Sequence, residues 1–243
     1  MSIFSLASAA GISFIFAMTT LGSATVLFFP REKSLVLQRI MMGFAAGVMS
    51  AAAVWSLLLP AMAQTETDGV FPVWLPASAG LVLGAMFIAF LELWQQGNRG
   101  QNLLFTAVTL HNIPEGMAVG LAFALTAMGE SAASALALAF GIGVQNFPEG
   151  AAVSLPMNQS GLSRKAAFLK GVMSGAVEPA FAILAMLTAA YVYPVMPWLL
   201  SFSAGAMLYV SVSELLPEAS GFSGNYAYIG GFTFMMLLDT ALG

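Results

Sequence analysis

Apolar runs of about 20 residues or more follow one another along almost the whole chain, separated by short polar connections. A helix rises ~1.5 Å per residue and the hydrocarbon core of a membrane is ~30 Å thick, so such runs match membrane-spanning helices. We expect eight spans, at about 4–29, 36–63, 72–94, 102–127, 131–157, 164–190, 195–218 and 225–242. The sequence therefore predicts an all-α polytopic membrane protein whose single transmembrane domain covers residues 1–243.

Composition excludes several other classes of protein. Only 7% of the residues are charged, against about 25% in a soluble domain, so no separate soluble domain fits. No cluster of basic residues is present, so the expected surroundings are a lipid bilayer and no nucleic-acid partner is expected. The absence of cysteine excludes a disulfide, a thiolate metal site and a cysteine nucleophile.

The cationic residues are distributed unevenly among the connections. All 7 lie in or beside the first, third or fifth connection: Arg31, Lys33, Arg39, Arg99, Arg164, Lys165 and Lys170. Positively charged connections tend to stay on the cytoplasmic side of a membrane. We therefore predict that these three connections are cytoplasmic and that both termini are extracytoplasmic.

Two of the expected spans carry the same polar motif. Residues 111–116 read HNIPEG and residues 145–150 read QNFPEG. On a helix, positions i and i+4 share a face, so the first polar residue lies over the glutamate, with the asparagine about 100° further round. The proline removes a backbone donor and crowds the carbonyl four residues earlier. The side chains concerned are His111, Asn112 and Glu115 in the first motif and Gln145, Asn146 and Glu149 in the second.

Imidazole, amide and carboxylate groups at this spacing make a ligand set for a divalent cation. One such motif could serve only helix packing, but two copies with the same order of polar residues favour a binding site. Charged groups in the middle of a membrane are costly and usually functional. Counted from the span ends, both motifs and Glu178 reach the middle of the membrane, and Pro179 predicts a helix break there.

The second and seventh spans also resemble each other. FAAGVM is followed by SLLLPA at 56–61, and FSAGAM is followed by SELLPE at 213–218. These copies lie five spans apart and therefore cross in opposite directions, as do the adjacent fourth and fifth spans. Inverted repeats with interrupted helices near their axis are typical of secondary transporters. Chance recurrence of small apolar motifs is the alternative explanation for the second and seventh spans.

Four further acids lie within the spans. Glu92 lies near the inner end of the third span, and Glu214 and Glu218 would form a cytoplasmic exit station or simply be solvated. Asp239 lies near the outer end of the eighth span, where it would sit at an outer mouth. Three GxxxG pairs favour close packing within the bundle, with a homodimer interface as the alternative. They are Gly43/Gly47, Gly116/Gly120 and Gly171/Gly175.

The succession of HNIPEG and QNFPEG, with eight spans and outside termini, resembles the ZIP (Zrt/Irt-like) family of divalent metal transporters and looks most like its bacterial GufA-like branch. The resemblance covers essentially the whole chain. It implies inward transport of Zn²⁺, with Fe²⁺, Mn²⁺ or Cd²⁺ handled by some members, no cofactor, and a bacterial inner membrane. It also implies a binuclear metal centre with bridging motif glutamates. One metal would bind His111, Glu115, Gln145 and Glu149, and the other Asn112, Glu115, Asn146, Glu149 and Glu178.

Two other classes of function remain as alternatives. An intramembrane zinc hydrolase usually needs three protein ligands and a water, commonly with two or three histidines, and this chain has only His111. A membrane scaffold or sensor leaves the mid-membrane glutamates without a role. We therefore expect a transporter and not an enzyme, and the ligand types alone do not distinguish Zn²⁺ from Fe²⁺ or Mn²⁺.

Overall fold

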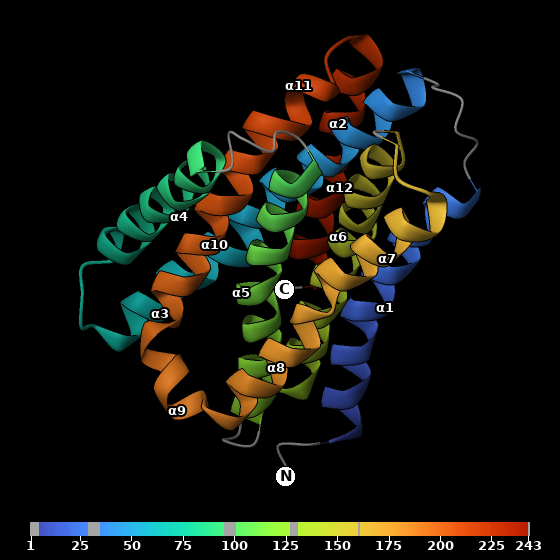
Figure 1. The fold of residues 1–243 in the computed structure, drawn as a ribbon. Coiled ribbons are helices and arrows are strands. Elements are labelled where there is room, and N and C mark those ends of the chain that lie inside the picture. The colour runs from blue at the N-terminus through green and yellow to red at the C-terminus, as the bar shows by residue number, and fades with distance from the viewer. Residues whose placement is uncertain (1–4, 29–34, 95–100, 127–130, 160, 243) are drawn as a thin grey trace.

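The computed structural model describes residues 5–28, 35–94, 101–126, 131–159 and 161–242. Every regular element in these ranges is helical (Figure 1), which confirms the all-α prediction. The first, third and fourth expected connections, with Arg31, Lys33 and Arg99, lie largely outside the described residues. The side chain of His111 is also outside them, although its backbone belongs to a described helix.

The helices follow one another along the chain, and some of them, such as α2, η1 and α3, continue directly into the next (Figure 1). They are α1 (Leu6–Phe28), α2 (Leu35–Ala52), η1 (Ala53–Leu58), α3 (Leu59–Asp68), α4 (Trp74–Trp94), α5 (Gln101–Thr126), α6 (Ala132–Gln159), α7 (Arg164–Gly175), α8 (Val177–Leu187), α9 (Ala189–Val192), η2 (Tyr193–Val195), α10 (Met196–Val210), η3 (Ser211–Leu215), α11 (Leu216–Glu218) and α12 (Phe222–Leu242).

Several of these helices, alone or joined to the next, have the length and composition of membrane spans. Among the described residues, 5 runs qualify: Leu6–Phe28, Leu35–Asp68, Trp74–Trp94, Arg164–Leu187 and Ala189–Glu218. The motif helices α5 and α6 are also long, with 26 and 28 residues, and α12 has 21. This architecture is that of a polytopic membrane protein.

The helices pack in two groups. In the first group, α1 packs chiefly on α6, and α5 chiefly on α8. In the second group, α2 packs chiefly on α12, and α10 chiefly on α4. Both motif helices belong to the first group, and contacts of α2 with α6 and of α10 with α5 join the groups.

Glycines allow the paired helices to approach closely. A Cβ atom added to Gly84 of α4 would strike the carbonyl of Phe202 in α10, and one added to Gly231 of α12 would strike the carbonyl of Phe44 in α2. Phe44 and Phe202 begin the matching sequences FAAGVM and FSAGAM. The α2–α12 and α4–α10 pairs therefore pack through equivalent positions, with the small residues typical of membrane helix interfaces.

The three GxxxG pairs are also used within the chain. Cβ atoms on Gly43 and Gly47 would strike α12, those on Gly116 and Gly120 would strike α8, and those on Gly171 and Gly175 would strike side chains of α1. These contacts agree with the expectation that the pairs pack within the bundle.

The motif prolines and Pro179 have different effects on their helices. α5 and α6 continue as α-helix through Pro114 and Pro148, so the motif prolines do not end the helices. The sixth expected span does break, at Ala176 between α7 and α8, as Pro179 predicted. A proline disturbs the carbonyl four residues earlier, which here belongs to Gly175, the last residue of α7. A proline is well tolerated in the first turn of a helix, where its missing N–H leaves no bond unmade.

Two π-helical segments stand at matching places. η1 is followed by Pro60 and η3 by Pro217. A proline ring crowds the carbonyl four residues earlier, which here belongs to Ser56 and Ser213, and a wider turn relieves that contact. Local π-helical turns are often found at functional sites, and both are associated with acidic residues. Ser56 of η1 donates a hydrogen bond to Asp239, and η3 contains Glu214.

Candidate metal site

Three helices bring the predicted ligands together. α5 contributes Asn112 and Glu115, α6 contributes Gln145, Asn146 and Glu149, and α8 contributes Glu178. Each of these six side chains is at most 1% exposed. Burial of so many polar groups requires partners, because an unpaired polar group loses its hydration without compensation. The partners of these side chains therefore define the site.

Gln145 joins the two motifs. Its Nε2 donates a hydrogen bond to Oε1 of Glu115, 30 residues earlier in the chain. The bond runs from the amide of the second motif to the carboxylate of the first. The two motifs thus belong to one site, which neither helix forms by itself.

Glu178 is held through both of its carboxylate oxygens. Thr19 of α1 donates Oγ1–H to Oε1 at 2.9 Å, and Asn146 donates Nδ2–H to Oε2 at 2.7 Å. These two bonds give both oxygens a donor and fix the orientation of the carboxyl group. Glu178 also interacts electrostatically with Glu115 and Glu149, so it belongs to the same cluster as the motif residues.

Three buried amide oxygens have no hydrogen-bond donor among the described residues. They are Oδ1 of Asn112, Oε1 of Gln145 and Oδ1 of Asn146. A buried acceptor without a donor costs about 1–3 kcal/mol. A bound cation would recover this cost, because amide oxygens are cation ligands.

The orientation of each amide follows from its nitrogen. Nδ2 of Asn112 donates to the carbonyl oxygen of Ser174 at 3.0 Å, while Gln145 donates to Glu115 and Asn146 to Glu178. Since an amide nitrogen only donates and an amide oxygen only accepts, these bonds fix which side each oxygen faces. All three oxygens therefore point away from these hydrogen bonds and are available to another partner, such as a cation.

The cluster is rich in carboxyl groups. Glu115, Glu149 and Glu178 lie together in the interior, and buried charges need a counter-charge or a metal ion. Among the described side chains, no group of three His, Cys, Asp or Glu residues has a ready metal-binding arrangement. The donor set therefore combines carboxylates with amides, and the side chain of His111 lies outside the described residues.

The glycine after each motif glutamate brings the ligand helices into contact. A Cβ atom on Gly116 would strike the carbonyl of Glu178 in α8, and one on Gly150 would strike the carbonyl of Thr19 in α1. Any larger residue would separate these helices. The Gly of Pro-Glu-Gly therefore controls the distance between the motif helices and their neighbours.

A cavity of about 440 Å³ lies beside the site, between η1, α3, α6 and α12. Asp239 lines it and accepts a hydrogen bond from Oγ of Ser56 at 2.8 Å, and Oδ2 of Asp239 has no donor among the described residues. A Cβ atom on Gly141 of α6 would lie 3.8 Å from Oδ1 of Asp239. Gly141 precedes Gln145 by about one helical turn, so this cavity adjoins the motif region.

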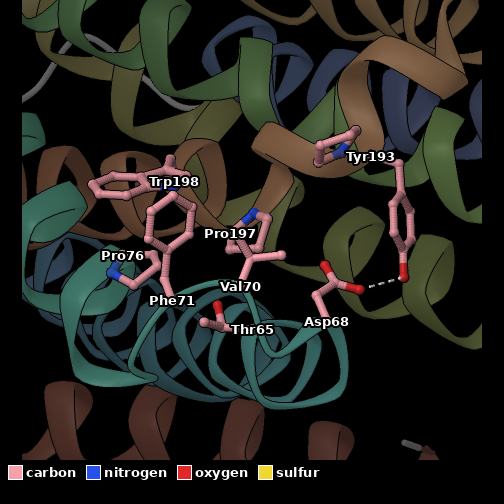
Figure 2. A pocket seen from close by; sticks show the side chains of 9 residues that line it. Thr65, Asp68, Val70, Phe71, Pro76, Tyr193, Pro197 and Trp198 are labelled. Carbon is pink, nitrogen blue, oxygen red and sulfur yellow. Dashed lines mark hydrogen bonds between the residues drawn. The ribbon is translucent and has the colours of Figure 1, made fainter.

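A second pocket, of about 310 Å³, is lined by the end of α3, the start of α4 and the segment from η2 to α10 (Figure 2). Its lining is mostly apolar, with Phe71, Pro197 and Trp198 on one side. On the other side the hydroxyl of Tyr193 donates to Oδ1 of Asp68 at 3.3 Å. None of the predicted metal ligands lines this pocket.

The remaining acids of the spans lie close to one another. Glu214 of η3 interacts electrostatically with Glu92 and Glu218. Glu218 is exposed and accepts a hydrogen bond from Nε2 of Gln38 at 2.9 Å, and Glu92 accepts one from the hydroxyl of Tyr209 at 2.6 Å. Glu92 of α4, Glu214 of η3 and Glu218 of α11 therefore form a second acidic group.

Fold and site together define a class of protein: a polytopic helical membrane protein with a buried cluster suited to a cation. Comparison with known proteins gives the family. The family described as ZIP Zinc transporter matches residues 91–239. The chain belongs to the ZIP family, as the resemblance of its motifs predicted.

Similarity to individual relatives extends beyond the matched region. Zinc transporter ZIP11 of Homo sapiens is 32% identical over 96% of this chain and 96% of its own length. Zinc transporter GufA of Myxococcus xanthus is 34% identical over 78% of this chain and 81% of its own length. Zinc transporter ZIPB of Bordetella bronchiseptica is 34% identical over 94% of this chain and 79% of its own length.

Proposed function

We propose that this protein transports divalent metal ions across a membrane into the cytoplasm, with zinc as the main substrate. The observation that carries this proposal is the buried cluster in which three glutamates meet three amide oxygens that have no donor among the described residues. Zinc is favoured because the three relatives named above are zinc transporters. Fe²⁺, Mn²⁺ and Cd²⁺ are the competing substrates to test, since carboxylate and imidazole ligands suit several of these metals.

The cluster divides naturally into two metal positions. The first would use His111, Glu115, Gln145 and Glu149, and the second Asn112, Glu115, Asn146, Glu149 and Glu178. The hydrogen bonds support this division, because Gln145 contacts Glu115 whereas Asn146 contacts Glu178. To bind a metal, each amide would offer the oxygen that faces away from its present hydrogen bond.

The path of the ion would connect the two sides of the membrane through this cluster. Asp239 and its cavity would admit ions from the outer side, one turn of α6 before Gln145. Glu214 and Glu218 would release them on the inner side. An excess of carboxylates along a narrow path attracts cations and raises their local concentration.

Alternating access would come from movement between the two helix groups. The predicted ligands belong to α5, α6 and α8, all in the first group, while α2, α4, α10 and α12 form the second. The equivalent packing of α2–α12 and α4–α10 supports an inverted repeat, which is typical of secondary transporters. Movement of the first group against the second would carry the whole ligand set together.

The membrane arrangement that fits this path has eight spans, with both termini outside and the cationic connections in the cytoplasm. Bacterial relatives such as GufA make a bacterial inner membrane the expected location. The hydrolase alternative gains no support from the relatives, which are named as transporters. We therefore propose a transporter without enzymatic activity.

Uptake of metal by purified protein in proteoliposomes tests the proposal. A zinc-sensitive dye inside the vesicles should report saturable Zn²⁺ entry that empty vesicles lack. Vesicles that contain Glu115→Gln protein in equal folded amount should take up at least about tenfold less, because a metal ligand is lost. Uptake at the rate of empty vesicles by well-folded parent protein would contradict transport.

A further inference from the structure

Thr19 of α1 and Glu178 of α8 occupy equivalent places beside the two motif helices. Gly116, which ends the first motif, packs against the backbone of Glu178, and Gly150, which ends the second motif, packs against the backbone of Thr19. The glycines occupy the same motif position, so α1 meets α6 as α8 meets α5. Each motif helix therefore has one polar side chain of a neighbouring helix beside its motif. This side chain is Glu178 of α8 beside α5 and Thr19 of α1 beside α6.

The two equivalent side chains also contact each other. Oγ1–H of Thr19 donates to Oε1 of Glu178 at 2.9 Å, and Thr19 is 1% exposed. A hydroxyl has one proton to donate, and its other acceptor is the carbonyl oxygen of Ile15 at 3.2 Å. The bond to the carboxyl oxygen of Glu178 is the shorter of the two.

The surroundings hold Thr19 at this place. A Cβ atom on Gly175 would lie 2.6 Å from Cγ2 and 2.8 Å from Cβ of Thr19, so a glycine is needed there for α1 to approach. Gly175 ends α7, and the break at Ala176 is followed by the first turn of α8, which carries Glu178. Thr19 thus packs against the junction that orients the glutamate.

We propose that Thr19 is a positioning residue of the metal site, whose hydroxyl holds Oε1 of Glu178 so that Oε2 faces the metal. On metal binding, Oε2 would release the Nδ2–H of Asn146 and take the ion as its partner, while Asn146 would bind through Oδ1, the oxygen that has no donor among the described residues. Thr19 keeps its bond to Oε1 throughout. The inference rests on the proposed function, because it assigns a role within the second metal position.

Substitutions that separate the hydroxyl from the methyl group test this role. Thr19→Val removes the hydroxyl and keeps the shape, while Thr19→Ser keeps the hydroxyl and removes the methyl group. Ser23→Ala is the matched control, because Ser23 is a buried hydroxyl one turn further along α1. Among the described residues it bonds to the carbonyls of Thr19 and Gly150 and not to a predicted metal ligand. Equilibrium dialysis of purified protein with Zn²⁺ gives the affinity of each binding step.

The relevant Zn²⁺ binding step is the one assigned to the second metal position, which is identified by its loss in Glu178→Gln. Thr19→Val should weaken this step by about 10- to 100-fold, as loss of a hydrogen bond to a metal ligand typically does. Thr19→Ser and Ser23→Ala should bind like the parent. Equal losses in Thr19→Val and Thr19→Ser would overturn the proposal, because packing and not the hydroxyl would then be responsible.

A double variant tests whether Thr19 acts through Glu178. Added to Glu178→Gln, Thr19→Val should leave the remaining Zn²⁺ step unchanged, and a further loss there would overturn the proposal. The variants also separate this inference from the proposed function. If Glu149→Gln loses zinc while Thr19→Val binds like the parent, only the role of Thr19 is wrong. If the parent binds no zinc, both fail.

Discussion

The amide of Gln145 donates to the carboxylate of Glu115, and this one hydrogen bond joins the two copies of the Pro-Glu-Gly motif across α5 and α6. Two motifs on separate helices could each have served local packing. Their side chains instead pair between helices, which leaves the oxygen of Gln145 without a donor among the described residues. The pairing supports a single shared site.

The two metal positions should respond to different substitutions. His111→Ala should damage the first position and its preference for Zn²⁺ over harder ions, because imidazole is the only nitrogen ligand proposed. Glu178→Gln should remove the second position and spare the first. Isothermal titration with Zn²⁺ and Mn²⁺ measures both steps. Identical losses of both steps in His111→Ala and Glu178→Gln would show that the two positions are not separable.

Asp239 should govern access to the site without binding the ion there. Asp239→Asn should lower Zn²⁺ uptake severalfold at limiting concentration, because one carboxylate is lost from the cavity beside Gly141. Binding of Zn²⁺ to the protein in detergent should stay near the parent value. Asp68→Asn is the matched control, since Asp68 lines the other pocket. An equal fall in uptake for both variants would argue against a specific outer path.

Two neighbouring glycines of α12 should respond oppositely to alanine. A Cβ atom on Gly231 would strike the carbonyl of Phe44, so Gly231→Ala should destabilise the α2–α12 pair by about 1–3 kcal/mol. A Cβ atom on Gly230 has nothing within 4 Å, so Gly230→Ala should stabilise the helix by about 0.5–1 kcal/mol. Thermal unfolding in detergent measures both. A similar Tm for the two variants would contradict the helix packing described.

The proposed orientation can be tested on a chain that has no cysteine of its own. Thr67 and Ser220 are both exposed and lie at opposite ends of the proposed topology. In intact cells, an impermeant thiol reagent should label Thr67→Cys, on the outer side, and should label Ser220→Cys only after the membrane is opened. The reverse pattern would invert the orientation.

Local sequence signals predicted the helical class, and they predicted that polar side chains of the two motifs lie together, as Glu115 and Gln145 do. Long apolar runs identify spans, and the i to i+4 spacing places polar side chains on one face, so both inferences need only one helix. The bond between Gln145 and Glu115 was not predicted, because it depends on how α5 and α6 cross. Thr19 carried no local signal, since a lone threonine in an apolar span becomes part of the site only when α1 packs on α6.

The helix irregularities show a similar limit. Pro179 is preceded by the predicted break, at Ala176, whereas α5 and α6 continue through Pro114 and Pro148. A missing backbone donor is a local property, whereas its structural effect depends on the neighbouring helices, which can support a proline within a continuous membrane helix. The π-helical segments before Pro60 and Pro217 are a different response to the same local feature.

Uptake and binding by Glu149→Gln test the central claim most directly, because Glu149 is proposed as a ligand of both metals. The substitution keeps the size of the side chain and removes its charge. On samples matched for folded yield, it should abolish high-affinity Zn²⁺ binding and lower uptake into proteoliposomes by about 100-fold or more. Well-folded Glu149→Gln protein that binds and transports Zn²⁺ like the parent would show that the site is not formed by these residues.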